Sequence, residues 1–112
     1  MAFYVYILAS GKNGTIYTGS TEDLCVRVAE HREKTLGGFT AKYGVARLVW
    51  FESHPSRESA FRRERQIKEW RRAWKLRLIE TRNSQWKDLF DDLERHVLEE
   101  ERRSEGDPRW GG

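Results

Sequence analysis

The sequence predicts an α+β domain, in which helices flank a small three-stranded antiparallel sheet in the order β-β-α-β-α-α-α. Three observations support this. The chain has 112 residues, which is enough for one small hydrophobic core. Two strand-like runs separated by turn residues come first and predict a hairpin. Most of the second half has apolar residues at helical spacing.

The hairpin is predicted from residues 3–19. Residues 3–8 are aromatic or aliphatic and indicate a strand buried on both faces. Residues 10–14 include an Asn-Gly pair and form a turn. Residues 15–19 are the second strand, and so short a connection requires antiparallel pairing.

A helix and a third strand are expected next. Ser20 or Thr21 can cap the helix, which continues to about Lys34 and ends at residues 37–38, a Gly-Gly pair. Residues 47–52 are rich in Val, Trp and Phe, and predict the third strand.

Three helices are expected in the remainder. Residues 55–56 (Pro-Ser) begin a long helix that continues through Trp70. Residues 71–81 continue as a second helix. Residues 83–84 (Asn-Ser) cap a last helix over about residues 85–95.

We therefore predict one domain over residues 1–95, followed by a helix extension and a mobile charged tail over residues 96–112. The 14 aromatic residues argue against a disordered chain. The single cysteine, Cys25, allows no intramolecular disulfide. The longest apolar run, residues 2–9, is too short to cross a membrane and lacks a basic flank. We expect a cytoplasmic protein with no membrane partner.

Charge is unevenly distributed. Residues 57–82 carry ten Lys and Arg against four Asp and Glu, a net charge of +6, whereas residues 83–112 carry five against nine, a net charge of −4. The basic segment is typical of a polyanion-binding surface, and equally of a solvated helix face.

Two polar residues fall near an apolar helix stripe. Leu24, Val28 and His31 share one face of the predicted first helix, and Arg27 lies at its edge. A cation and an imidazole near the sheet indicate a functional site. The alternative is an arginine that extends to solvent and a hydrogen-bonded core histidine.

Glu64 presents the same anomaly on the long helix. Ala60, Phe61, Ile67 and Trp70 mark the expected buried side, and Glu64 falls in its middle. A carboxylate there is costly unless it binds a metal or pairs with a cation such as a nearby arginine.

Residues 70–75 interleave cations with two tryptophans. This run could bind a phosphate backbone, or the tryptophans could pack inward with the arginines outward.

Together these residues resemble the GIY-YIG nuclease superfamily, and in particular its small stand-alone bacterial members. The resemblance covers residues 2–93. It rests on Tyr4-Val5-Tyr6, Tyr17-Thr18-Gly19, Arg27, His31 and Glu64, with further similar segments at residues 39–44 and 70–75.

The resemblance implies a divalent-metal-dependent endonuclease that hydrolyses phosphodiester bonds in DNA, usually with Mg²⁺ (or Mn²⁺). Tyr6 and Tyr17 match the motif tyrosines, and Arg27 matches the catalytic arginine. His31 matches a position filled by Tyr or His, and Glu64 matches the metal-binding glutamate. Tyr17 would act as general base or orient the nucleophile, with Tyr6 and His31 positioning it.

The sequence departs from the family pattern at three positions and in the spacing before a fourth. Tyr4 and Thr18 replace a Gly and an Ile that carry no chemistry in the family. Ser20 stands where some relatives have an active-site lysine. Asn83 is the best match to a late catalytic asparagine, and could instead only cap a helix.

The expected partner is DNA, whether branched, flapped or single-stranded, bound by a monomer or weak homodimer. The candidate contacts are Lys42, Arg63, Arg71, Arg72 and Lys75. One alternative function is a non-catalytic nucleic-acid-binding module of the same fold. Another is a protein-interaction module that uses the tryptophans and the acidic tail.

Overall fold

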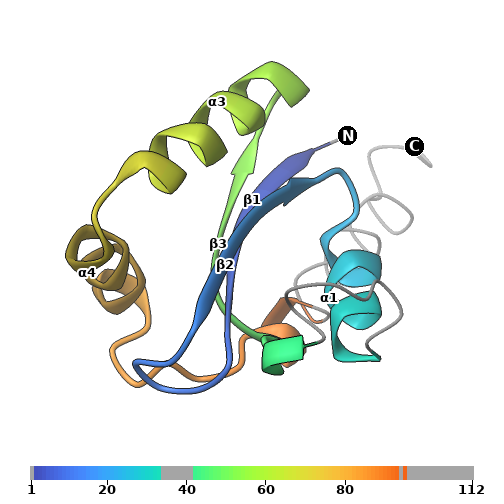
Figure 1. The fold of residues 1–112 in the computed structure, drawn as a ribbon. Helices are drawn as coiled ribbons and strands as arrows, with labels where there is room; N and C mark the ends of the chain where they lie inside the picture. The colour runs from blue at the N-terminus through green and yellow to red at the C-terminus, as the bar shows by residue number, and fades with distance from the viewer. Residues whose placement is uncertain (1, 34–41, 94, 96–112) are drawn as a thin grey trace, which may run out of the picture.

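A three-stranded antiparallel sheet in the order β2-β1-β3 lies at the centre of the structure, with helices on both faces (Figure 1). This computed structural model describes residues 2–33, 42–93 and 95. Its elements are β1 (Phe3–Ala9), β2 (Ile16–Thr21), α1 (Leu24–Arg32), β3 (Arg47–His54), α3 (Arg57–Glu69) and α4 (Arg72–Arg82). A short helical stretch, residues 90–93, follows. The predicted α+β class and antiparallel hairpin are confirmed.

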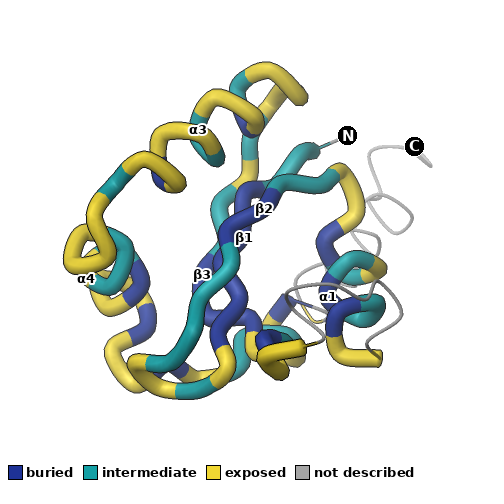
Figure 2. The backbone as a smooth tube through the Cα atoms, viewed as in Figure 1, coloured by how far each residue is buried: buried dark blue, intermediate teal, exposed yellow. Residues whose placement is uncertain are grey.

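The two faces of the central strand β1 bury different side chains, because successive residues of a strand point to opposite sides. Val5, Ile7 and Ala9 pack in a core with Ile67 of α3 and Ile79 of α4. On the other face, a second core contains Tyr6 and Leu8 of β1 and the α1 residues Leu24 and Val28, together with Val45, Leu48 and Leu93. Figure 2 shows β1 as an almost continuous buried segment between these layers.

The first helix begins later than predicted. β2 continues through Ser20 and Thr21, and Asp23 caps α1 by accepting from the Val26 N–H at 3.2 Å. The Thr21 hydroxyl accepts from the Asp23 N–H instead of capping the helix. The predicted end of this helix at Lys34 and residues 37–38 lies outside the described residues.

The predicted helix over residues 85–95 is wrong at its start, because residues 84–89 are not helical. Trp86 is fully buried with a positive φ of 57°, so the chain turns here to place the indole in the core. Helical structure begins only at Phe90, whose N–H is capped by Asp88. Asn83 is the C-cap of α4 and does not begin the last helix.

Other predicted boundaries differ by a few residues. β3 extends to His54, and α3 begins after its N-cap Ser56, whose hydroxyl accepts from the Ser59 N–H. The predicted tail, residues 96–112, lies outside the described residues, so the division into a domain and a tail stays a prediction. No helix among the described residues is long and apolar enough to cross a membrane.

Candidate active site

Tyr6 and Tyr17 come together because β1 and β2 pair with Tyr6 opposite Gly19. Their ring centroids are 6.3 Å apart. A Cβ added at Gly19 would lie 2.6 Å from the Tyr6 hydroxyl oxygen and 3.1 Å from Cε1 of Tyr17. Residue 19 therefore has to be glycine for both rings to lie where they do.

His31 of α1 completes an aromatic cluster with the two tyrosines. Its ring centroid lies 5.5 Å from that of Tyr17 and 6.1 Å from that of Tyr6. The Tyr6 hydroxyl lies 3.4 Å from Nε2 of His31. The predicted stripe of Leu24, Val28 and His31 is confirmed, since all three are buried.

The environment shifts the pKa of two members of this cluster. Burial raises the pKa of Tyr6, as do Tyr17 and Glu64, whereas Arg27 acts in the opposite direction. Burial and Arg27 lower the pKa of His31, and Glu30 opposes them. Tyr6 is therefore a neutral phenol and His31 a neutral imidazole at pH 7. The contact between them is a hydrogen bond between two neutral groups.

Glu64 approaches from α3, the layer on the other face of the sheet. Its Oε1 accepts from the Ser20 hydroxyl at 2.5 Å, and its Oε2 pairs with Nζ of Lys68 at 2.6 Å. The side chain is 12% exposed. The cation that pairs with this carboxylate is thus a lysine four residues along the helix, not the arginine that the ion-pair alternative suggested.

Arg27 lies at an open hollow beside Ser20. The hollow has a volume of about 490 Å³ and runs between the end of β2 and the first turns of α3. It is lined by Phe3, Ser20, Thr21, Glu22, Arg27, Arg57, Glu58, Ala60 and Phe61. Ser20 thus borders the hollow and also contacts Glu64.

The predicted site residues form two groups on either side of β2. Tyr6, Tyr17 and His31 make one group, and Glu64 joins Ser20 on the other face. Arg27 and Glu64 both influence the pKa of Tyr6, so the two groups interact electrostatically. Asn83 contributes to neither group, because its side-chain amide forms hydrogen bonds with the Val49 carbonyl and with the backbone of Lys87.

Most of the predicted nucleic-acid contacts have intramolecular partners. Arg63 bonds Glu52 and Gln66. Arg72 donates to the carbonyls of Asn13 and Gly14.

The remaining candidates lie near aromatic rings or a helix backbone. The exposed Arg71 and Lys42 stack on Trp74 and Tyr43, and Lys75 donates to the Lys68 carbonyl.

Sequence reasoning missed the two residues that contact Glu64 and misplaced one aromatic residue. Lys68 lies four residues after Glu64, a spacing that pairs opposite charges on a helix. Ser20 was predicted as a possible helix cap and as the replacement of an active-site lysine, not as a partner of Glu64. Phe61, expected on the buried side of the helix, is 53% exposed, and Trp74 is 50% exposed, which contradicts the alternative in which both tryptophans pack inward.

Comparisons with known proteins identify the family. A family model described as the GIY-YIG catalytic domain matches residues 2–77. The chain therefore belongs to the GIY-YIG family, whose members are generally nucleases, and a nuclease domain implies a nucleic-acid substrate.

Within that family the relatives are small bacterial proteins of the UPF0213 group. A UPF0213 protein of Staphylococcus haemolyticus is 40% identical over 83 residues, which is 70% of this chain and 95% of that protein. A UPF0213 protein of Staphylococcus aureus is 34% identical over 79 residues, with the same coverage. The solution NMR structure of a UPF0213 protein from Bacillus halodurans is 34% identical with a TM-score of 0.50, and the match covers 79% of this chain and 93% of that one.

Proposed function

We propose that this protein is a divalent-metal-dependent endonuclease that hydrolyses phosphodiester bonds in DNA, and acts as a monomer or weak homodimer. One observation carries the proposal. Ser20 connects the carboxylate of Glu64 to the edge of a hollow that also contains Arg27. Arg27 and Glu64 both influence the pKa of Tyr6, which belongs to the cluster with Tyr17 and His31.

Glu64 suits a magnesium or manganese ion. Mg²⁺ is usually held by one or two carboxylates together with waters and substrate phosphates, so a site with one protein carboxylate is ordinary for a nuclease. Among the described residues, no three His, Cys, Asp or Glu side chains gather into a metal-binding group. Most of the ligands would therefore be water and phosphate. When bound, the metal would supply Lewis-acid stabilisation of the phosphoryl group.

Arg27 would bind the phosphate under attack. Its guanidinium is permanently charged and can donate two parallel hydrogen bonds to phosphate oxygens, where negative charge develops in the transition state. Its position at an open hollow is accessible to a polyanion.

Tyr17 would take the proton from the attacking water or orient that water. It is half-buried, whereas Tyr6 is 2% exposed and His31 is 5% exposed. Tyr6 and His31 therefore suit the role of fixing the Tyr17 ring better than direct contact with DNA. We assign Asn83 a structural role, because its amide is occupied by main-chain partners.

The test is cleavage of supercoiled plasmid and of single-stranded, flapped and branched DNA, with Mg²⁺ or Mn²⁺ and with a chelator. We expect metal-dependent nicking by the parent protein and none by Glu64→Gln, with DNA affinity unchanged within a few-fold. Equal cleavage by Glu64→Gln and the parent would exclude the metal role. A Glu64→Gln protein that does not fold would favour a purely structural ion pair.

A second candidate is a non-catalytic nucleic-acid-binding module. The observation in its favour is that both carboxylate oxygens of Glu64 already have partners, Ser20 and Lys68. This function predicts a metal-independent gel shift with no cleavage of any of the four substrates.

A further inference from the structure

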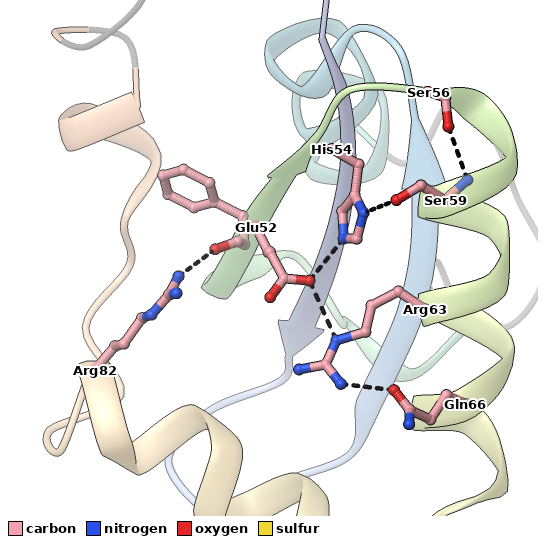
Figure 3. Close-up of polar contacts among 8 residues, drawn as sticks. Glu52, His54, Ser56, Ser59, Arg63, Gln66 and Arg82 are labelled. Atoms are coloured by element: carbon pink, nitrogen blue, oxygen red, sulfur yellow. Dashed lines mark hydrogen bonds and ion pairs between the residues drawn. The ribbon is translucent and has the colours of Figure 1, made fainter.

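A chain of polar contacts joins the end of β3 to α3, outside the hollow described above (Figure 3). We call it the β3–α3 network, and it consists of Glu52, His54, Ser59 and Arg63. Nε2 of His54 lies 2.7 Å from the Glu52 carboxylate, and Nδ1 lies 2.5 Å from the Ser59 hydroxyl. Nε of Arg63 donates to the same Glu52 oxygen at 3.2 Å.

We propose that the β3–α3 network is a positioning device, which fixes the rotation of α3 about its axis and thereby holds Glu64 beside Ser20. The inference rests on the proposed role of Glu64 in metal binding. It adds residues that no family motif quoted above contains.

Apolar packing alone gives α3 little rotational constraint. Only Ala60 and Ile67 of its thirteen residues are buried. Contacts of a small and a branched aliphatic side chain are non-directional, so the helix could roll at small cost. Hydrogen bonds depend on angle and distance, and those of the network define one orientation.

The network and Glu64 hold two different sides of the helix. Ser59 and Arg63 are four residues apart, and therefore lie on one side, which faces β3. Glu64 is one residue further, about 100° around the helix, and faces β2 through Ser20. Any roll of α3 that moves Ser59 away from β3 also moves Glu64 relative to Ser20.

The expected displacement is large enough to matter. The side chains of a helix extend about 5 Å from its axis, so a roll of roughly 15° moves them by about 1 Å. Misplacing a reacting group by about 1 Å can cost on the order of a hundredfold in rate. The network can therefore change the reaction rate through the position of Glu64, although none of its four residues lines the hollow.

Serine, histidine and glutamate in hydrogen-bonded order also resemble a hydrolytic triad. Two sets of contacts favour a positioning role over the role of a hydrolytic triad. Arg63 takes the same carboxylate oxygen as His54 and itself donates to Gln66 at 2.7 Å, so the chain of contacts continues along α3. Ser59 is also fixed through its backbone, because its N–H donates to the Ser56 hydroxyl.

The test compares two serines of the same helix turn in the full-length protein. Ser59→Ala removes the link to His54, whereas Ser56→Ala removes the helix cap and leaves that link in place. Ser59→Thr keeps the hydroxyl and serves as the conservative rescue. Arg63→Gln breaks the link to Glu52 and replaces Ser59→Ala if that variant does not fold.

The first measurement is the amide NMR spectrum of β2, which requires neither metal nor DNA. We expect the Ser20 resonance to move in Ser59→Ala and Arg63→Gln, and to stay near its parent position in Ser56→Ala and Ser59→Thr. The second is Mn²⁺ titration followed by electron paramagnetic resonance, where the first two variants should bind several-fold more weakly. The kcat of Ser59→Ala should fall by about tenfold or more at unchanged DNA affinity.

Two results would overturn the proposal: equal effects of Ser59→Ala and Ser56→Ala on the Ser20 resonance, or labelling of Ser59 by a fluorophosphonate. Failure of the proposed function is distinguishable, because Glu64→Gln would then bind Mn²⁺ like the parent. The NMR comparison would still decide whether the network orients α3.

Discussion

Gly19 allows the two tyrosines of the candidate active site to pack closely because it has no side chain. Alanine there would place a methyl group 2.6 Å from the hydroxyl oxygen of the buried Tyr6 and 2.7 Å from its Cζ. Since Tyr6 lies in a closely packed core, we expect Gly19→Ala to destabilise the fold by roughly 1–3 kcal/mol, the usual cost of overpacking. Urea unfolding measures this. Gly11→Ala is the control, because a Cβ at Gly11 meets nothing within 4 Å.

The pKa of His31 predicts how stability depends on pH. Burial and Arg27 lower this pKa in the folded state, and Glu30 partly offsets them. The unfolded chain then binds a proton below about pH 6.5 while the folded chain does not. Stability from this group is complete above that pH and is lost as the pH falls toward the lowered pKa.

Melting temperatures measured from pH 8 to pH 5 check this expectation. The parent should lose stability over that range, and His31→Gln should lose less, because it has no imidazole to titrate. A parent curve with the same slope as the His31→Gln curve would contradict the assigned shift.

Lys68 would compete with a divalent cation at the proposed metal ligand Glu64. Its ammonium lies 2.6 Å from Oε2, and the lysine side chain is 49% exposed whereas the carboxylate is 12% exposed, so the pair is half-exposed and contributes about 1 kcal/mol, the upper end for surface pairs. Lys68→Ala should therefore tighten Mn²⁺ binding by up to about fivefold. Isothermal titration measures this. Lys12→Ala, in the turn at the far end of β2, should leave the affinity unchanged.

At the scale of elements, the cap of α1 provides a direct test of the revised helix boundary. Asp23→Ala removes the acceptor of the Val26 N–H, and should cost about 1 kcal/mol in the free energy of unfolding. Glu22→Ala is the neighbouring control, because its ion pair with Arg57 is exposed and 3.5 Å long and is worth little. Urea denaturation of both variants makes the comparison.

The elements that were predicted correctly are those marked by a few neighbouring residues in the sequence. The aromatic and β-branched run of β1, the turn before β2 and the Ser56 cap of α3 each lie within a few residues, and the predicted starts of these elements agree with the structure to within one or two residues. The predicted start of the last helix after Asn83 is wrong, because burial of Trp86 bends the chain and helical structure begins only at Phe90. That contact is tertiary, and no window of residues around Trp86 reveals it.

In the candidate site too, some contacts were predictable from local sequence patterns and others depend on tertiary structure. Spacing on α1 predicted that His31 faces the sheet, and the family resemblance placed Tyr6 and His31 at one site, where the structure has them in contact. The contact between Ser20 and Glu64 spans 44 positions in the sequence. It depends on how α3 crosses the sheet, and residue spacing carries no information about that crossing.

At the scale of the whole molecule, the basic segment predicts salt-sensitive DNA binding. Each phosphate neutralised contributes nearly one to the slope of log K against log salt concentration. We expect Arg71→Ala to reduce this slope by about one, because Arg71 is exposed with its guanidinium over Trp74. Removal of the residues after Ser104 should not weaken binding. An affinity that is constant between about 50 and 200 mM salt would contradict a surface that follows phosphates.

The position of β1 in the middle of the sheet also sets an order of assembly during synthesis. β1 and β2 leave the ribosome together and can pair at once, since a short turn joins them. One face of β1 stays uncovered until Ile67, Ile79 and Trp86 have been made. A nascent chain that stops before Trp86 therefore exposes an aliphatic strand face, which is a substrate for chaperones until translation resumes.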